Sequence, residues 1–129
     1  LTNLAENYSI FDLSDAYLSK NLSRSSKILN ENNFSDEDCI ALIRAISNRS
    51  KRLLKLMQDY KDTKNIETTV ERFKPPIFWK EKESIKKQIL SWTEGEINRT
   101  IYECNDIEML IKKNSSSALN LVSDFVYNY

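Results

Sequence analysis

Apolar residues recur every three or four positions through most of the chain, which is the period of an amphipathic α-helix. The longest such stretch predicts a helix over about residues 35–61. Ser35 is placed to cap this helix, and the three acidic residues that follow suit the positive end of the helix dipole. One face then carries apolar side chains, with Ser50 interrupting the stripe: Cys39, Ile43, Ile46, Leu53, Met57 and Tyr60.

Two shorter helices are predicted before it. Ser9 or Asp12 can cap the first, and Lys20 with Asn21 breaks it. Its apolar positions are Leu13, Ala16 and Tyr17. The second is predicted over 22–29, and a polar loop is expected over 30–33.

The second half of the chain predicts helices over about 66–72 and 82–92. Asn65 can cap the first, and Pro75 disfavours helical conformation at the residue before it. The prolines are expected to make an extended, stiff link between the two helices. Trp92 falls at core spacing in the second of these helices.

Two helices are predicted to close the chain. Thr93 and Glu96 form a capping box that opens a helix running to about Lys112. After a turn over 114–117 that offers an N-cap, the last helix carries its apolar side chains on one face: Ala118, Val122, Phe125 and Tyr129.

The fold class follows from these elements. No segment alternates with the period of a strand, and one glycine and two prolines in 129 residues are too few for a sandwich or barrel. We predict an all-α fold, a compact bundle of about six to seven helices over residues 9–129. Residues 1–8 show no clear period and are interpreted as the tail of a preceding domain or a linker.

The composition argues against chemistry within this chain. Histidine is absent, so the commonest general base and metal ligand is missing, and one glycine cannot build a phosphate-binding loop. Cys39 and Cys104 are far apart and predict two buried, reduced thiols of a cytoplasmic protein. No apolar run reaches the length of a membrane span. We expect no catalytic site, no cofactor, no metal and no membrane partner.

Charge is neutral overall but unevenly distributed. Residues 44–87 hold thirteen basic and six acidic side chains, and both flanking thirds are acidic. These charges either are solvated helix faces or form a patch that contacts a polyanion; composition leaves both open.

The segment Arg72–Lys82 is the candidate site. It holds both prolines, the Phe78-Trp79 pair and four basic residues. Trp79 is predicted to stack on a base while Lys80 and Lys82 hold phosphates, with Lys74 extending the track towards Lys86 and Lys87. In the alternative, Phe78 and Trp79 anchor the connector on the core. A second candidate is a protein interface that includes Tyr127 and Tyr129, since tyrosine is favoured at such surfaces.

The same residues resemble the C-terminal helical domain of the delta subunit of bacterial DNA polymerase III, a clamp-loader subunit. The likeness covers about residues 9–129, starting with Phe11 to Ala16, and is strongest from Arg72 onwards. In this part of the chain the likeness rests on the two adjacent prolines, the Phe78-Trp79 pair and the spaced lysines, and also on the helices that follow them. The motifs are loose, the closing helix has few charges, and the last loop offers no aromatic residue.

The resemblance implies a non-catalytic collar domain that helps assemble the clamp loader for DNA replication. Its partners would be gamma/tau-type and delta-prime subunits and primer–template DNA. The sliding clamp would be reached only through N-terminal domains missing from this chain, within a holoenzyme that is a DNA-directed DNA polymerase. Trp79 would meet the duplex end as a wedge. The alternative is a helical protein–protein adaptor with no nucleic-acid role, for which Trp79 should be buried and the basic charges dispersed.

Overall fold

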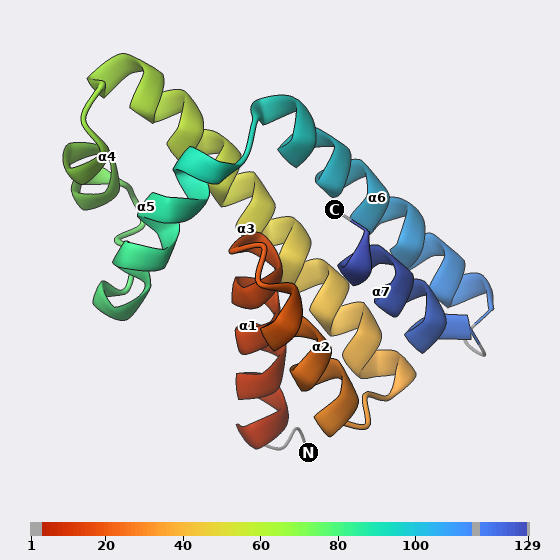
Figure 1. Ribbon diagram of the computed structural model, residues 1–129. Coiled ribbons are helices and arrows are strands. Elements are labelled where there is room, and N and C mark those ends of the chain that lie inside the picture. Colours follow the sequence, from red (N-terminus) through yellow and green to blue (C-terminus); the bar gives the residue numbers. More distant parts are fainter. Residues whose placement is uncertain (1–3, 115–116, 129) are drawn as a thin grey trace.

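The computed structural model describes residues 4–114 and 117–128, and within them the chain forms seven α-helices, one short 3-10 helix and no strand (Figure 1). The predicted all-α fold class is therefore confirmed. The helices are α1 (Leu4–Leu18), α2 (Leu22–Glu31), α3 (Asp36–Thr63), α4 (Ile66–Arg72), α5 (Lys82–Ser91), α6 (Glu94–Lys113) and α7 (Ala118–Tyr127), and the 3-10 helix η1 (Trp79–Glu81) precedes α5.

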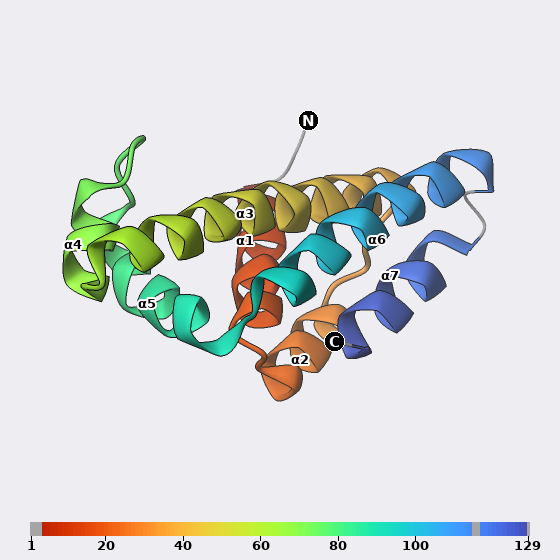
Figure 2. The ribbon, with the colours of Figure 1, turned by 90° about the horizontal axis from the view of Figure 1, so that it is seen from above.

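The 28-residue helix α3 organises the bundle. Helix α6 packs along it, while α1 crosses it and α2 packs on α1 (Figures 1 and 2). Helices α4 and α5 cover the end of α3 that lies away from α2. This arrangement places the connector between α4 and α5, residues 73–81, at one end of the molecule.

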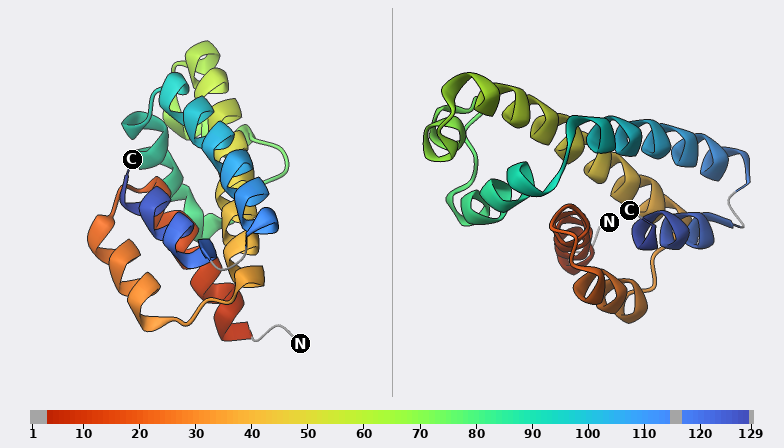
Figure 3. Two further views of the ribbon diagram at one scale, coloured as in Figure 1. Left: turned by 90° about the vertical axis from the view of Figure 1, so that its right-hand side faces the viewer. Right: turned by 45° about the horizontal axis from the view of Figure 1, so that its top comes forward.

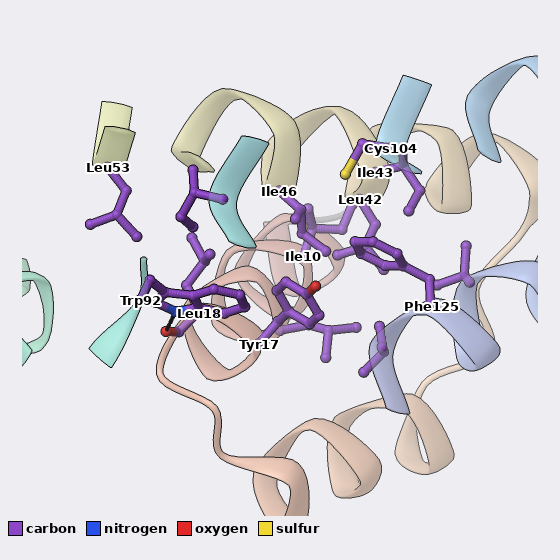
Figure 4. Close-up of a cluster of buried hydrophobic side chains, with 14 of the residues drawn as sticks. Ile10, Tyr17, Leu18, Leu42, Ile43, Ile46, Leu53, Trp92, Cys104 and Phe125 are labelled. Atoms are coloured by element: carbon purple, nitrogen blue, oxygen red, sulfur yellow. Dashed lines mark hydrogen bonds between the residues drawn. The ribbon is translucent and has the colours of Figure 1, made fainter. Parts of the chain in front are cut away.

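The core is built around an aromatic run between the helices (Figure 4). The Tyr17 ring stacks on Phe125 with centroids 4.9 Å apart and lies 6.0 Å from the Trp92 ring. Both Tyr17 and Trp92 are buried, which confirms the core position predicted for Trp92. These rings join α1, α7 and the α5–α6 junction into one apolar unit.

Local capping chemistry sets several helix boundaries as predicted. Ser35 and Asp38 form a reciprocal capping box at the start of α3, and Thr93 and Glu96 do so at the start of α6. The side chain of Asn65 accepts a hydrogen bond from the Thr68 backbone and caps α4. The N-cap of α7 is Ser117, within the predicted turn, but its side chain makes no capping hydrogen bond. Residues 115, 116 and Tyr129 lie outside the described residues.

The first two helices are longer than predicted. Helix α1 begins at Leu4 and passes through both proposed cap positions, and α2 continues to Glu31 through half of the predicted loop. At its end, Asn32 donates to the carbonyl of Ile28 at 2.8 Å and accepts from Ser9 of α1 at 3.0 Å. The end of α2 thus depends on a contact with another helix.

Cys39 and Cys104 are buried and unpaired, as predicted. Burial raises the pKa of the Cys39 thiol to about 11 and that of Cys104 to about 12, in both cases with a smaller contribution from neighbouring acidic groups. Among the described helices, none is long and apolar enough to cross a membrane.

Candidate nucleic-acid interface

Two buried side chains hold the connector on the helices. Phe73 follows the last residue of α4 and is 7 % exposed, and Ile77 is 6 % exposed. Between them, Lys74 and Pro75 form a bend, so the predicted extended link is wrong at this point. The peptide bond between these two residues is cis. Both apolar anchors turn inwards, and the chain between them therefore arches away from the helices (Figures 2 and 3).

The two aromatic residues after Ile77 lie on the outside. Phe78 is 55 % exposed and Trp79 is 69 % exposed, and their ring centroids are 5.9 Å apart with the planes tilted by 57°. The ammonium group of Lys80 lies 5.4 Å from the Trp79 ring centroid, within the range of a cation–π contact. The interpretation of Phe78 and Trp79 as core anchors is therefore wrong, because Phe73 and Ile77 take that place.

The predicted lysine track is divided by ion pairs. Lys74 and Lys80 are exposed and have no ion-pair partner among the described residues. Lys82, in contrast, donates to both carboxylate oxygens of Glu71 at 2.9 Å, and this contact lowers the pKa of Glu71. The charge of Lys82 is thus already compensated within the fold.

The remaining lysines of the predicted track also differ from each other. Lys86 donates to Glu67 at 2.5 Å and to Glu83 at 3.1 Å, and these hydrogen bonds raise its pKa. Lys87 is exposed without an ion-pair partner in the described part of the chain. The structure therefore leaves Lys74, Lys80 and Lys87 available to an external anion.

The basic middle third as a whole is partly neutralised. Seven of its thirteen cations form ion pairs, which leaves fewer individual cations available to an external ligand. The seven are Arg44, Arg49, Arg52, Lys55, Lys61, Lys82 and Lys86. Only Arg44 and Lys61 pair with carboxylates from outside this third, Glu108 and Glu94, so the excess of positive charge falls from seven to five.

One of these ion-pair networks positions the connector. Glu81, the last residue of η1, accepts from Arg49 of α3 at 2.7 Å and lies 3.7 Å from the guanidinium of Arg52. These three side chains are between 20 and 27 % exposed, so water screens the contacts only in part. Burial lowers the pKa of Arg52, and Glu81 opposes that shift. The network ties the residue two positions after Trp79 to the central helix.

A groove of about 490 Å³ lies beside the connector and adds aromatic residues that the sequence analysis did not assign to a site. Tyr8 and Phe11 of α1 and Phe78 line it, and all three are more than half exposed. The guanidinium of Arg49 lies 5.4 Å from the Phe11 ring centroid. These residues come together only because α1 packs beside the connector. In the sequence, the apolar pattern of α1 indicates only that Tyr8 and Phe11 lie outside the buried face of that helix.

The exposed aromatic and basic side chains of the connector offer a surface suited to stacking. An exposed indole with a cation over it offers a flat surface on which a base can stack. Among the described residues, no three histidine, cysteine, aspartate or glutamate side chains come together as a metal site.

Comparisons with protein-family models, with curated proteins and with solved structures found no match. The resemblance to the clamp-loader delta subunit therefore rests on the sequence alone, above all on Arg72–Lys82 and the helices that follow.

Proposed function

We propose that this chain is a non-catalytic assembly and DNA-contacting domain of the kind found at the C-terminus of the clamp-loader delta subunit. In this proposal it helps hold gamma/tau-type and delta-prime subunits together in a cytoplasmic complex. Its connector meets the end of primer–template DNA, and it would act within the replicative DNA polymerase. The observation that carries the DNA contact is the 69 % exposure of Trp79 beside Lys80, which has no ion-pair partner among the described residues.

The proposed contact uses two kinds of interaction. Trp79 stacks on the terminal base pair, and such stacking is worth about 1–3 kcal/mol per base. Lys80 and Lys74 bind backbone phosphates, each releasing counterions and so making affinity depend on salt. Lys82 contributes less than the sequence suggested, because binding a phosphate would require it to leave Glu71.

The alternative function is a helical adaptor without a nucleic-acid role. The partial neutralisation of the basic third favours it, because a strong polyanion-binding surface usually keeps its cations available. The exposure of Trp79 argues against it, since the adaptor was expected to bury that side chain. Both functions share the assembly role and differ only in DNA binding.

The test is a titration of primer–template DNA at low salt with the whole chain and with the reconstituted clamp loader. Trp79→Ala should weaken DNA binding about 5- to 140-fold, which corresponds to the stacking free energy of about 1–3 kcal/mol. Trp79→Phe should retain most of the affinity. Leu22→Ala is the control, because Leu22 on α2 is 46 % exposed and lines neither the groove beside the connector nor that between α6 and α7. Unchanged DNA binding and clamp loading by Trp79→Ala would leave only the adaptor function.

A further inference from the structure

A second surface lies between α6 and α7, outside the connector and its groove. It is a groove of about 260 Å³ with an apolar floor made by Ile107, Leu121 and Phe125. Phe125 is buried in the aromatic core, and Ile107 and Leu121 are partly buried. Phe125 stacks on Tyr17, so the floor of the groove is continuous with the aromatic core.

The rim of this groove is acidic. Glu103, Asp106 and Asp124 line it, and within the described residues no lysine or arginine does. Asp106 and Asp124 are exposed and have no ion-pair partner in the described part of the chain. Glu103 accepts a hydrogen bond from Arg99 at 3.2 Å, but the Arg99 side chain is 82 % exposed, so the pair is weak and easily exchanged.

The apolar surface continues beyond the groove along α6. Leu110 lies one helical turn after Ile107 and is 48 % exposed. Tyr102 lies one turn before Asp106 and is 73 % exposed. An apolar strip with a carboxylate rim repels nucleic acid, so its chemistry is opposite to that of the connector.

We propose that the α6–α7 groove binds a basic amphipathic helix of a partner protein. An apolar side chain of that helix sits on the floor, and its flanking lysine or arginine residues pair with the carboxylates of the rim. Charge complementarity selects this occupant, and two adjacent helices offer the ridges between which a third helix packs. The inference deepens the assembly role and rests on the proposed function for that role, but it does not depend on DNA contact.

The test compares two synthetic helical peptides of equal length on the full chain by fluorescence anisotropy. Both carry the same leucine stripe, one flanked by lysines and the other by glutamates. The lysine peptide should bind and lose affinity with added salt, and the glutamate peptide should not bind. The double variant Asp106→Lys/Asp124→Lys should weaken binding of the lysine peptide at least tenfold and gain binding of the glutamate peptide.

Two further variants keep the result specific. Glu31→Lys/Asp62→Lys changes the net charge equally at exposed residues that do not line the groove. Like the wild type, this variant should bind the lysine peptide and should not bind the glutamate peptide. Leu110→Asn removes exposed apolar surface without changing the charge, and it should weaken binding of the lysine peptide without creating binding of the glutamate peptide.

The proposal is overturned if Asp106→Lys/Asp124→Lys binds the lysine peptide as tightly as wild type, or if the control double variant loses as much affinity. Trp79→Ala should leave peptide binding unchanged. DNA binding is therefore tested by Trp79→Ala, and peptide binding by Asp106→Lys/Asp124→Lys. Failure of one proposal can be told apart from failure of the other.

Discussion

The indole nitrogen of Trp92 donates a 2.7 Å hydrogen bond to the backbone carbonyl of Leu18 (Figure 4). This contact joins the end of α5 to the end of α1, and the ammonium of Lys20 lies 4.4 Å from the same ring. The other tryptophan, Trp79, is 69 % exposed. The chain thus uses one tryptophan to hold the bundle together and exposes the other at its surface.

Substitution of the two tryptophans should therefore affect stability very differently. Trp92→Ala should lower the free energy of unfolding by about 3–5 kcal/mol, because it leaves a cavity and an unpaired carbonyl in the core. Trp79→Ala should change it by about 0.5 kcal/mol or less, as expected of an exposed side chain. Urea denaturation followed by circular dichroism measures both. Equal destabilisation by the two variants would contradict the separation of roles.

The positions of these two tryptophans show what the sequence reveals and what it does not. Trp92 follows Ile85 and Ile89 at helical spacing, so its burial is predictable from the pattern. Trp79 lies after two prolines, where no period exists to assign a face. Phe73 and Phe78 have the same side chain, yet one is buried and the other exposed, so only packing in the folded core decides which residues of the connector turn inwards.

The same reasoning explains the helix boundaries and the ion pairs. Asn65 and Thr93 cap their helices through residues three positions away, so local sequence is enough to find them. The pairing of Lys82 with Glu71 spans the connector, and that of Glu81 with Arg49 spans 32 positions. Such contacts depend on the fold, which is why the charge available for binding was overestimated from the sequence.

Glu81→Gln should loosen the connector as well as destabilise the fold. The substitution leaves the guanidinium groups of Arg49 and Arg52 without their carboxylate in a partly buried place, which should cost about 1–2 kcal/mol. Glu83→Gln is the matched control, since the Glu83 side chain is 82 % exposed and should contribute at most a few tenths of a kcal/mol. Urea titrations give the stabilities, and acrylamide quenching of fluorescence reports the order of Trp79. A Glu81→Gln protein as stable as Glu83→Gln would contradict the positioning role.

Acid should weaken the contact between α3 and α6 through Glu108. Hydrogen bonds from Arg44 and Lys112 lower the pKa of Glu108 to about 2 from an ordinary value of 4.5. Because the folded pKa lies below the unfolded one, the stabilisation is present above pH 4.5 and is lost as the pH falls towards 2. The carboxylate is close to solvent, so the loss should stay below about 1 kcal/mol and shrink with salt.

Glu108→Gln checks this prediction. The variant should be slightly less stable than wild type at pH 7 and equally stable near pH 2, with the difference disappearing between those values. Asp62→Asn is a suitable control, because Asp62 is exposed and has no ion-pair partner among the described residues. If the two variants show the same pH dependence of stability, the Arg44–Glu108 pair makes no net contribution.

The thiols should be unreactive while the bundle is folded. Both are about 1 % exposed, and their pKa values of about 11 and 12 leave almost no thiolate at pH 8. Labelling with a disulfide reagent should therefore proceed at the rate of unfolding for Cys39 and Cys104 alike, and the labelling rate should rise sharply in denaturant.

Replacement of exposed Ser19 by cysteine gives a positive control that should react within the mixing time. Rapid labelling of Cys104 in the native protein would show that the α3–α6 contact opens on its own, because Cys104 of α6 is 1 % exposed and lies beside Ile43 and Ser47 of α3. Slow labelling of both thiols would instead show that α3 and α6 separate only when the whole bundle unfolds, as expected for helices that share one core.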